Sequence, residues 1–157
     1  MSVRISIGGL GKALRDDENG RGRALRRAVM DAATRGARTL AKRTPRGVTG
    51  AMANSWKPSE TPDGARIEND APYAGVVEAG ARPHSVSPEG MAAIQQWAER
   101  VLGQDPKTAR QIAWGIAGKL RTEGQVGRFI ARDYAADEAP KHLQDAINRS
   151  MRASGIK

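Results

Sequence analysis

The pattern of hydrophobic and polar residues changes its period along the N-terminal part of the chain. Over residues 3–7 apolar and polar residues alternate, which is typical of a half-buried strand or an extended arm. Over residues 23–43 apolar residues recur at helical spacing, and Pro45 and Gly47 follow the last of them. The pattern therefore predicts a short strand followed, after a polar turn at 16–22, by one long helix.

In the middle of the chain, turn-forming residues interrupt the periodic pattern of hydrophobic residues. Thr61-Pro62-Asp63-Gly64 combines a proline that presets φ with a glycine that accepts a positive φ. We expect residues 49–60 to be extended and residues 65–69 to return beside them as a β-hairpin. Residues 73–79 predict a helical turn, and residues 80–88 predict a loop.

Helical signals dominate the C-terminal part of the chain. Ser87 and Asp105 each precede a proline and an apolar stripe, which is the pattern of an N-cap followed by proline at the first helical position. Gly103 is expected to end the first of these helices, and the second is expected to end near Gly124. A short segment around residues 129–130 follows.

A last helix is predicted to begin at Asp137. Its inward stripe consists of Leu143, Ala146, Ile147 and Met151. The chain is expected to fray within 151–157, and 154–157 most of all. The 157 residues therefore predict a single domain, with an N-terminal arm or strand over 1–19, a main part over 20–150 and a frayed tail.

Charge distinguishes the long helix from the rest of the chain. The formal net charge is +9, and between residues 20 and 46 nine basic residues stand against a single acid, so nearly the whole excess lies there. Opposite the apolar face, the helix presents a cationic face made of Arg23, Arg27, Arg35, Arg38 and Lys42. A face of one sign predicts contact with DNA phosphates or an acidic protein rim, and a solvated helix face is the plain alternative.

Composition excludes several classes of protein. Only 39% of residues are hydrophobic and 4% are aromatic, so the core must be small, and self-association is a common way to add burial. The absence of cysteine excludes disulfides and thiolate metal sites. No apolar stretch predicts a signal peptide or a membrane span, so we expect no membrane partner.

The sequence offers little catalytic chemistry. Its two histidines, His84 and His142, lie in no metal-binding spacing. Residues 8–12 resemble a phosphate-binding loop only in part, because Ser6 stands where the first glycine belongs and Ala13 follows the lysine. We therefore expect no catalytic residue, no metal and no cofactor.

Three tryptophans are the large aromatic residues of a chain that has few. Trp56, Trp97 and Trp114 are expected mainly to fill the core. Trp97 and Trp114 lie beside the apolar stripes of their helices, so at least one of them is expected at a subunit contact.

Three stretches of residues 20–150 together form a recognisable pattern. The first is Thr49-Gly50-Ala51-Met52-Ala53-Asn54-Ser55, and the second is Asn69-Asp70-Ala71-Pro72-Tyr73-Ala74-Gly75-Val76-Val77-Glu78-Ala79-Gly80-Ala81-Arg82-Pro83-His84. The third comprises the helix with Trp97, the stripe over 109–120 and the segment 124–130. In order and spacing they resemble the tail-completion or neck proteins of lambda-like long-tailed bacteriophages, which carry T-G-x-L-x-x-S and P-Y-A-x-x-V-E-x-G-T-R-P-H segments. Ala81 departs from the usual threonine, and the usual prolines before Phe129 are missing.

The resemblance implies an α+β fold in which a long N-terminal helix packs on a small antiparallel β-sheet, with additional C-terminal helices. It implies a structural virion protein that completes the head–tail junction or the tail end as a ring-forming or ring-associated subunit. The implied partners are further copies in a homo-oligomeric ring, expected to be a hexamer, and neighbouring head-closure (stopper) and tail-terminator proteins. Phage DNA is a possible non-specific contact. The implied location is the neck or tail of the virion, and the host cytoplasm during assembly.

The resemblance also marks residues of the first two stretches as candidates for a subunit interface. These are Thr49, Gly50, Ser55, Tyr73, Glu78, Gly80, Pro83 and His84. No catalytic role comes with the resemblance.

Two other classes of protein compete with this interpretation. A non-enzymatic, basic DNA-binding accessory protein would also explain the cationic helix, and it would bind free DNA with a steep dependence on salt. A nuclease or hydrolase would need a cluster of metal ligands or a nucleophile with its base, and the sequence shows neither.

Overall fold

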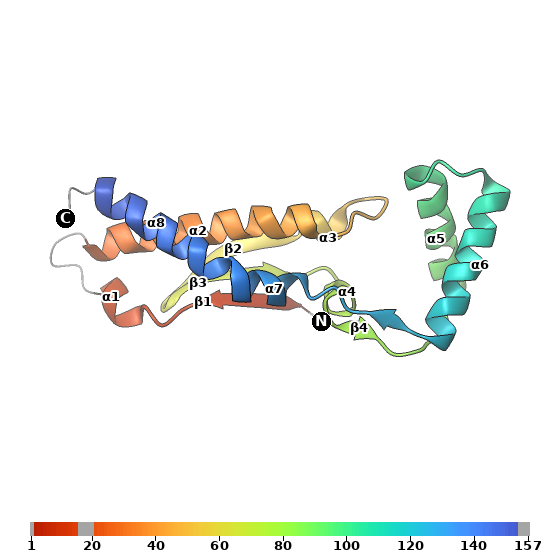
Figure 1. Cartoon of the computed structure of the whole chain (residues 1–157), viewed down its shortest axis with the longest axis horizontal. Helices are drawn as coiled ribbons and strands as arrows, with labels where there is room; N and C mark the ends of the chain where they lie inside the picture. The colour runs from red at the N-terminus through yellow and green to blue at the C-terminus, as the bar shows by residue number, and fades with distance from the viewer. Residues whose placement is uncertain (1, 16–20, 154–157) are drawn as a thin grey trace.

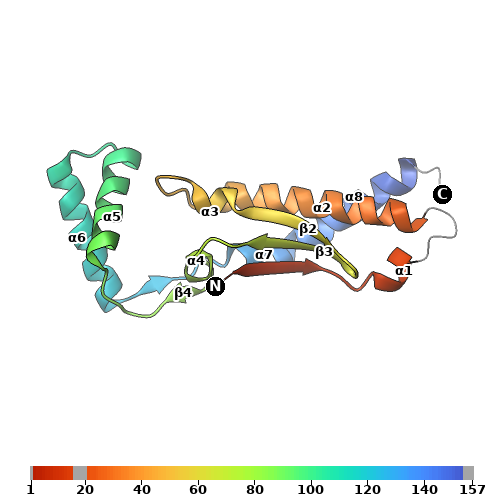
Figure 2. The ribbon, with the colours of Figure 1, turned by 180° about the vertical axis from the view of Figure 1, so that it is seen from behind.

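The computed structural model describes residues 2–15 and 21–153, and it has the predicted α+β fold (Figure 1). A body combines a three-stranded antiparallel sheet with helices α2 (Arg21–Arg43), α7 (Ile130–Asp137) and α8 (Ala139–Ala153). Two further helices, α5 (Pro88–Val101) and α6 (Pro106–Thr122), stand apart from the body at one end of the molecule (Figures 1 and 2). Residues 16–20 of the turn predicted over 16–22 lie outside the described residues, as does the predicted fraying at 154–157. Residues 21 and 22 already belong to helix α2, so the predicted turn is wrong there.

The sheet consists of β1 (Val3–Ile7), β3 (Gly64–Asn69) and β2 (Trp56–Thr61), in that spatial order. Both outer strands pair antiparallel with β3, so the predicted hairpin and the predicted N-terminal strand are confirmed. Pro58 lies opposite Ile67 in β2, which is an edge strand, where a residue without an N–H group is tolerated.

Helix α2 (Arg21–Arg43) confirms the predicted long helix and contacts two layers. Val29, Ala33 and Leu40 are buried in the main core with the isoleucines of the sheet. A neighbouring strip of small residues, Ala28 and Ala32, packs with Ala146 of α8 (Ala139–Ala153). The sheet and α8 therefore share the apolar side of one helix.

Gly36 of α2 leaves room for the side chain of Tyr134, a fully buried aromatic residue. A Cβ atom at this position would collide with the Oη atom of Tyr134, which belongs to α7 (Ile130–Asp137). The Tyr134 side chain is fully buried, and its Oη lies 3.1 Å from Nδ1 of His142. Burial, together with the charge of Glu138, raises the pKa of Tyr134 to about 12.

A tertiary hydrogen bond, continued by a local one, ties the C-terminal end of α2 to the sheet. Trp56 Nε1 donates to Thr44 Oγ1 at 2.8 Å, and the same hydroxyl donates to the Leu40 carbonyl at 2.7 Å. Trp56 and Thr44 are both buried, so the polar atoms that they bring into the core are satisfied. Trp56 is thus a core residue, as predicted.

Helices α5 (Pro88–Val101) and α6 (Pro106–Thr122) form an antiparallel hairpin with the predicted caps. Ser87 Oγ accepts from Gly90 N at 3.2 Å, and Asp105 Oδ1 accepts from Lys107 N at 3.0 Å and Thr108 N at 3.2 Å. Hydrogen bonds from the side chain and the amide of Thr108 lower the pKa of Asp105 below its ordinary value.

A two-stranded ribbon joins this hairpin to the body. It consists of β4 (Gly80–Ala81) and β5 (Gln125–Val126), and it follows the short helix α4 (Ala74–Ala79). A Cβ atom at Gly80, where φ is 83°, would collide with the Gln125 carbonyl oxygen. The prediction of a loop over 80–88 is therefore wrong at its first residues, because the partner strand lies more than 40 residues further along the chain.

Residues 51–54 depart from the prediction of an extended segment over 49–60. They form the short helix α3 (Ala51–Asn54), which begins after Gly50 in the left-handed conformation, with φ at 63°. The strand begins only at Trp56.

The C-terminal helices also differ from the prediction. Residues 130–137 form α7, so Asp137 ends one helix, and the last helix begins at Ala139. Residues 151–153 belong to α8 and not to a frayed tail. Met151 is 42% exposed, so its predicted inward position is wrong, because in the last turn of α8 it is Ser150 that faces α2, with its Oγ donating to the Ala24 carbonyl at 3.0 Å.

Candidate functional surfaces

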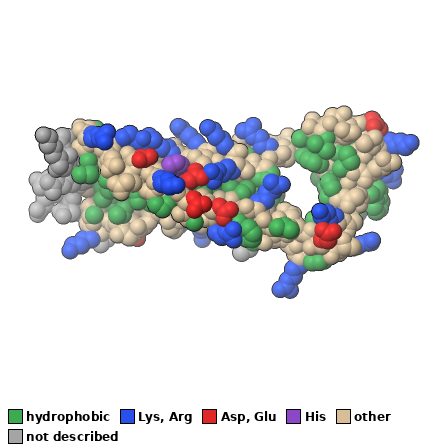
Figure 3. Space-filling view, in the orientation of Figure 1, with side chains coloured by type: hydrophobic (Ala, Val, Ile, Leu, Met, Phe, Trp, Pro, Cys, Tyr) green, Lys and Arg blue, Asp and Glu red, His purple; other side chains and the backbone are tan. Residues whose placement is uncertain are grey.

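The cationic face of α2 is the first candidate surface. Arg23, Arg27, Arg38 and Lys42 are exposed, and Arg35 is partly exposed. Figure 3 shows a row of Lys and Arg side chains along the edge of the molecule formed by α2. From Arg27 to Lys42 the row extends about 22 Å at the helical rise per residue.

Ion pairs divide this surface into two groups of cations. Arg35 pairs with Asp31 at 3.1 Å, and Arg149 of α8 pairs with the same carboxylate, also at 3.1 Å. No carboxylate of the described residues lies within ion-pair distance of Arg27, Arg38 or Lys42. These three cations therefore remain available to an external anion.

The other basic residues of α2 serve the fold. Arg26 pairs with Glu60 at 3.0 Å and donates to the Leu14 carbonyl at 3.0 Å, and Arg43 pairs with Glu138. Sequence periodicity had already placed Arg26 and Arg43 outside the cationic face. The structure thus reduces the sequence-predicted set to a shorter row of unpaired charges.

Glu78 in the second stretch has a defined structural role. Its Oε2 accepts from Ala131 N at 3.0 Å and its Oε1 accepts from Arg132 N at 2.9 Å. Both amides belong to the first turn of α7, whose N-terminus has no capping side chain of its own, because Phe129 occupies that position with φ at 49°. Glu78 therefore caps a helix that begins more than 50 residues after it, where a carboxylate also complements the helix dipole.

Gly80, Tyr73, Pro83 and His84 lie around the same connection. Gly80 is part of the ribbon, and Tyr73 precedes α4 with 45% of its surface exposed. Pro83 and His84 are exposed; His84 N donates to the Leu120 carbonyl at 3.1 Å, and its ring Nδ1 lies 2.8 Å from the Arg82 carbonyl. The structure brings these motif residues together where the hairpin leaves the body.

The first stretch forms a separate local structure beside α3. Thr49 Oγ1 accepts from Ala51 N at 3.3 Å, Gly50 supplies the left-handed turn, and Ser55 Oγ donates to the Ala51 carbonyl at 2.7 Å. These contacts shape the backbone between α2 and β2. They do not bring Thr49, Gly50 and Ser55 to the residues of the second stretch.

Asn69, the first residue of the second stretch, was not among the predicted interface residues. It is fully buried; its Nδ2 donates to the Met52 carbonyl at 2.8 Å, and its Oδ1 accepts from Ala71 N at 3.1 Å. It thus joins α3 to the end of the central strand. Its place in the second stretch and its polar side chain at the end of an apolar strand were the available signals.

No group of three or more potential metal ligands occurs in residues 2–15 and 21–153. The glycine-rich segment 8–12 is occupied by a carboxylate of the chain itself, because Asp63 accepts from Gly9 N at 2.7 Å and from Gly11 N at 2.8 Å. These are the amides that a phosphate would need. Within the described part of the chain, no helix is both long and apolar enough to cross a membrane.

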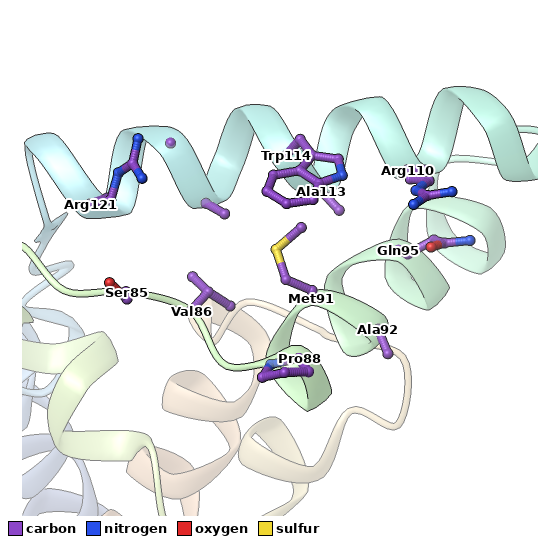
Figure 4. A pocket seen from close by; sticks show the side chains of 12 residues that line it. Ser85, Val86, Pro88, Met91, Ala92, Gln95, Arg110, Ala113, Trp114 and Arg121 are labelled. Carbon is purple, nitrogen blue, oxygen red and sulfur yellow. The ribbon is translucent and has the colours of Figure 1, made fainter.

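A groove on the α5–α6 hairpin is the second candidate surface. Met91 of α5 points toward the Trp114 ring of α6, and Arg110 and Arg121 lie toward the two ends of the groove (Figure 4). The groove encloses about 650 Å³. Trp114 is 63% exposed, whereas Trp97 is only partly exposed. Sequence reasoning identified both tryptophans as off-stripe residues but did not predict a groove.

No protein-family model matches the chain, and no curated protein and no solved structure gives a match.

Proposed function

We propose that this chain is a non-enzymatic structural protein of a bacteriophage virion, which completes the head–tail junction or the tail end as a ring-forming or ring-associated subunit. The observation that carries the proposal is the row of unpaired cations on α2, formed by Arg27, Arg38 and Lys42. Such a row, with no aromatic residues between the charges, suits contact with a phosphate backbone without reading of base sequence.

The resemblance to phage neck proteins supports the same proposal. The residues that carry it have structural roles in this fold: Glu78 caps α7, and Gly80 permits the close pairing of the ribbon. Residues that hold a connection between two parts of the chain in place suit a building block of an assembly.

The proposed partners follow from this role. They are further copies of the chain in a ring, taken as a hexamer, and the neighbouring head-closure and tail-terminator proteins. Phage DNA would be a non-specific contact of the α2 row, and no membrane takes part. The chain would reside in the neck or tail of the virion and, during assembly, in the host cytoplasm.

Mass spectrometry of purified phage particles, with heads and tails analysed separately, tests this proposal. We expect a few copies of the chain per particle, at the boundary between head and tail. Its absence from particles would contradict a virion role and would favour the accessory DNA-binding protein.

Charge reversal tests the role of the α2 row. We expect the triple variant Arg27→Glu, Arg38→Glu and Lys42→Glu to fold normally and to lower the yield of infectious particles. A matched control, Lys12→Glu, Arg100→Glu and Lys107→Glu, changes the net charge equally at exposed positions outside α2. Equal yields from both variants would show that the row has no assembly role.

A DNA titration separates the rival function. An accessory DNA-binding protein would bind free duplex DNA, with an affinity that falls steeply as salt increases. We expect weak binding or none from the isolated chain, because three cations on one subunit neutralise few phosphates, and only a ring would repeat them around a DNA channel.

A further inference from the structure

The chain exposes more surface than a compact monomer of its mass. Its solvent-accessible area is 10074 Å², whereas a compact protein of 16.8 kDa exposes about 7,700 Å². The excess of roughly 2,400 Å² is sufficient for two standard interfaces, each of which buries about 800 Å² per partner. The α5–α6 hairpin stands apart from the body at the end of the ribbon (Figures 1 and 2).

Exposed apolar residues gather at the same end of the molecule. Of the described large hydrophobic side chains that are clearly exposed, all but Met151 lie on the hairpin or where it leaves the body. Those on the hairpin are Val101, Leu102 and Trp114. The others are Tyr73, which precedes α4, Val76 in α4, and Val126 in β5. We call these three residues the root surface. Exposed apolar residues in one region indicate a contact with another protein.

The groove of the hairpin has a specific chemical character. Its floor is apolar, with Met91 and Trp114, and it has a cation toward each end (Figure 4). No carboxylate of the described residues lies within ion-pair distance of Arg110 or Arg121. Such a groove fits an apolar ridge that carries carboxylates beside it.

The chain itself carries such a ridge. Val126 in the root surface is 86% exposed, and helix α7, which begins four residues later, exposes Asp133 and Asp137. Asp133 pairs with Arg132 at 3.0 Å, whereas no cation of the described residues lies within ion-pair distance of Asp137. Acidic side chains lie among basic ones over α7 and α8 (Figure 3). Because opposite charges lie on two different surfaces of one chain, a second copy can offset the repulsion that a net charge of +9 otherwise causes.

We propose that the α5–α6 groove of one copy binds the root surface of the next copy, with Arg110 and Arg121 facing the carboxylates of the neighbour's α7. The contact is head-to-tail, because the two copies contribute different surfaces, and repeated contacts of this kind close into a ring when the rotation permits. The inference rests on the proposed function for its ring geometry, and it adds the surfaces that make the ring.

Crosslinking between introduced cysteines tests the contact directly, because the natural chain has none. Ala117→Cys places a thiol in the groove, and Val126→Cys places one on the root surface. Each variant of the full chain is purified, and the two are treated with a short bis-maleimide, alone and mixed. We expect a crosslinked dimer from the mixture and none from either variant alone.

Two crosslinking results would overturn the proposal. A dimer from Ala117→Cys alone would show that two grooves face each other symmetrically. An oligomer in light scattering that gives no crosslink in the mixture would place the contact elsewhere. A chain that stays monomeric up to its highest soluble concentration would also overturn the proposed self-contact. The proposed virion function is tested separately, and it fails only if the chain is missing from particles.

Truncation of the exposed tryptophan provides an independent measurement. We expect Trp114→Ala to weaken self-association at least tenfold in light scattering while leaving the thermal midpoint of the dilute protein unchanged. Met151→Ala is the matched control, because it removes an exposed apolar side chain at the opposite end of the molecule. Equal self-association of both variants would exclude the groove from the contact.

Discussion

The body and the α5–α6 hairpin use the same kind of amphipathic helix, but they bury it differently. In the body, Val29, Leu40, Ile67 and Tyr134 are each at most 1% exposed. In the hairpin, only alanines are fully buried among the described residues, and Trp114 remains 63% exposed. The difference lies in the neighbours, since α2 contacts a sheet and four other helices, whereas α5 and α6 have mainly each other.

This comparison shows what an amphipathic pattern does and does not specify. The pattern indicates which side chains gain free energy from burial, because the gain depends on the apolar area removed from water. It does not indicate whether the covering surface belongs to the same chain or to another one. The following predictions separate the two cases, from the largest expected effect to the smallest.

Tryptophan truncation should give the largest contrast between the two regions. Trp56→Ala should lower the free energy of unfolding by about 3–5 kcal/mol, because it leaves a cavity and removes the donor to the buried Thr44 hydroxyl, which then keeps only its own bond to the Leu40 carbonyl. Trp114→Ala should change it by less than about 0.5 kcal/mol, as exposed positions do. Urea denaturation measures both, and a large loss at Trp114 would show that the hairpin has a core of its own.

The same substitution at two helical glycines should have opposite signs. Gly36→Ala should destabilise the protein by about 1–3 kcal/mol, because its methyl group meets Tyr134 and Ile67 in a packed core. Gly118→Ala meets no atom within 4 Å and should stabilise dilute protein by about 0.5–1 kcal/mol through helix propensity. Thermal unfolding of the two variants provides the measurement; equal signs would contradict the difference in packing.

Removal of the cap on α7 tests the link between the two regions. Glu78→Ala should cost about 1–2 kcal/mol, because two amides of the first turn lose their acceptor. Glu78→Gln, which keeps one acceptor oxygen, should cost less. Hydrogen exchange of the Ala131 and Arg132 amides reports the loss locally, and unchanged protection in Glu78→Ala would argue against the cap.

The smallest effect should occur at alkaline pH. Tyr134 has a pKa of about 12 in the folded chain, above the value of about 10 for an unfolded chain. The folded state therefore keeps a proton that the unfolded state loses, and stability falls as the pH rises from about 10 towards 12. Tyr134→Phe should show a shallower decline in this range, and identical slopes would mean that Tyr134 ionises equally in both states.

Elements with local signals could be predicted from the sequence. Ser87 and Asp105, each followed by proline, marked the starts of α5 and α6, and the turn at 61–64 marked the hairpin of the sheet. The long α2 helix followed from its apolar period, and its cationic face from the residues opposite. In each of these cases the residues that decide the structure lie within a few positions of one another.

Elements that depend on distant residues could not be predicted. Helix α7 begins at a residue with positive φ, and its cap comes from Glu78, so no capping pattern precedes Ile130. The ribbon has two residues in each strand, too few for a period. The groove at Trp114 required the relative rotation of α5 and α6, which hydrophobic spacing within either helix does not fix.

The ribbon has a consequence for how the chain can vary. The chain leaves the body at Gly80 and returns at Val126, and these two residues pair directly. The hairpin is therefore an insertion whose two ends are already joined. Residues can be gained or lost between them without a shift in the register of the main sheet. Evolution can therefore change the length of the α5–α6 hairpin while the core of the body keeps its sequence.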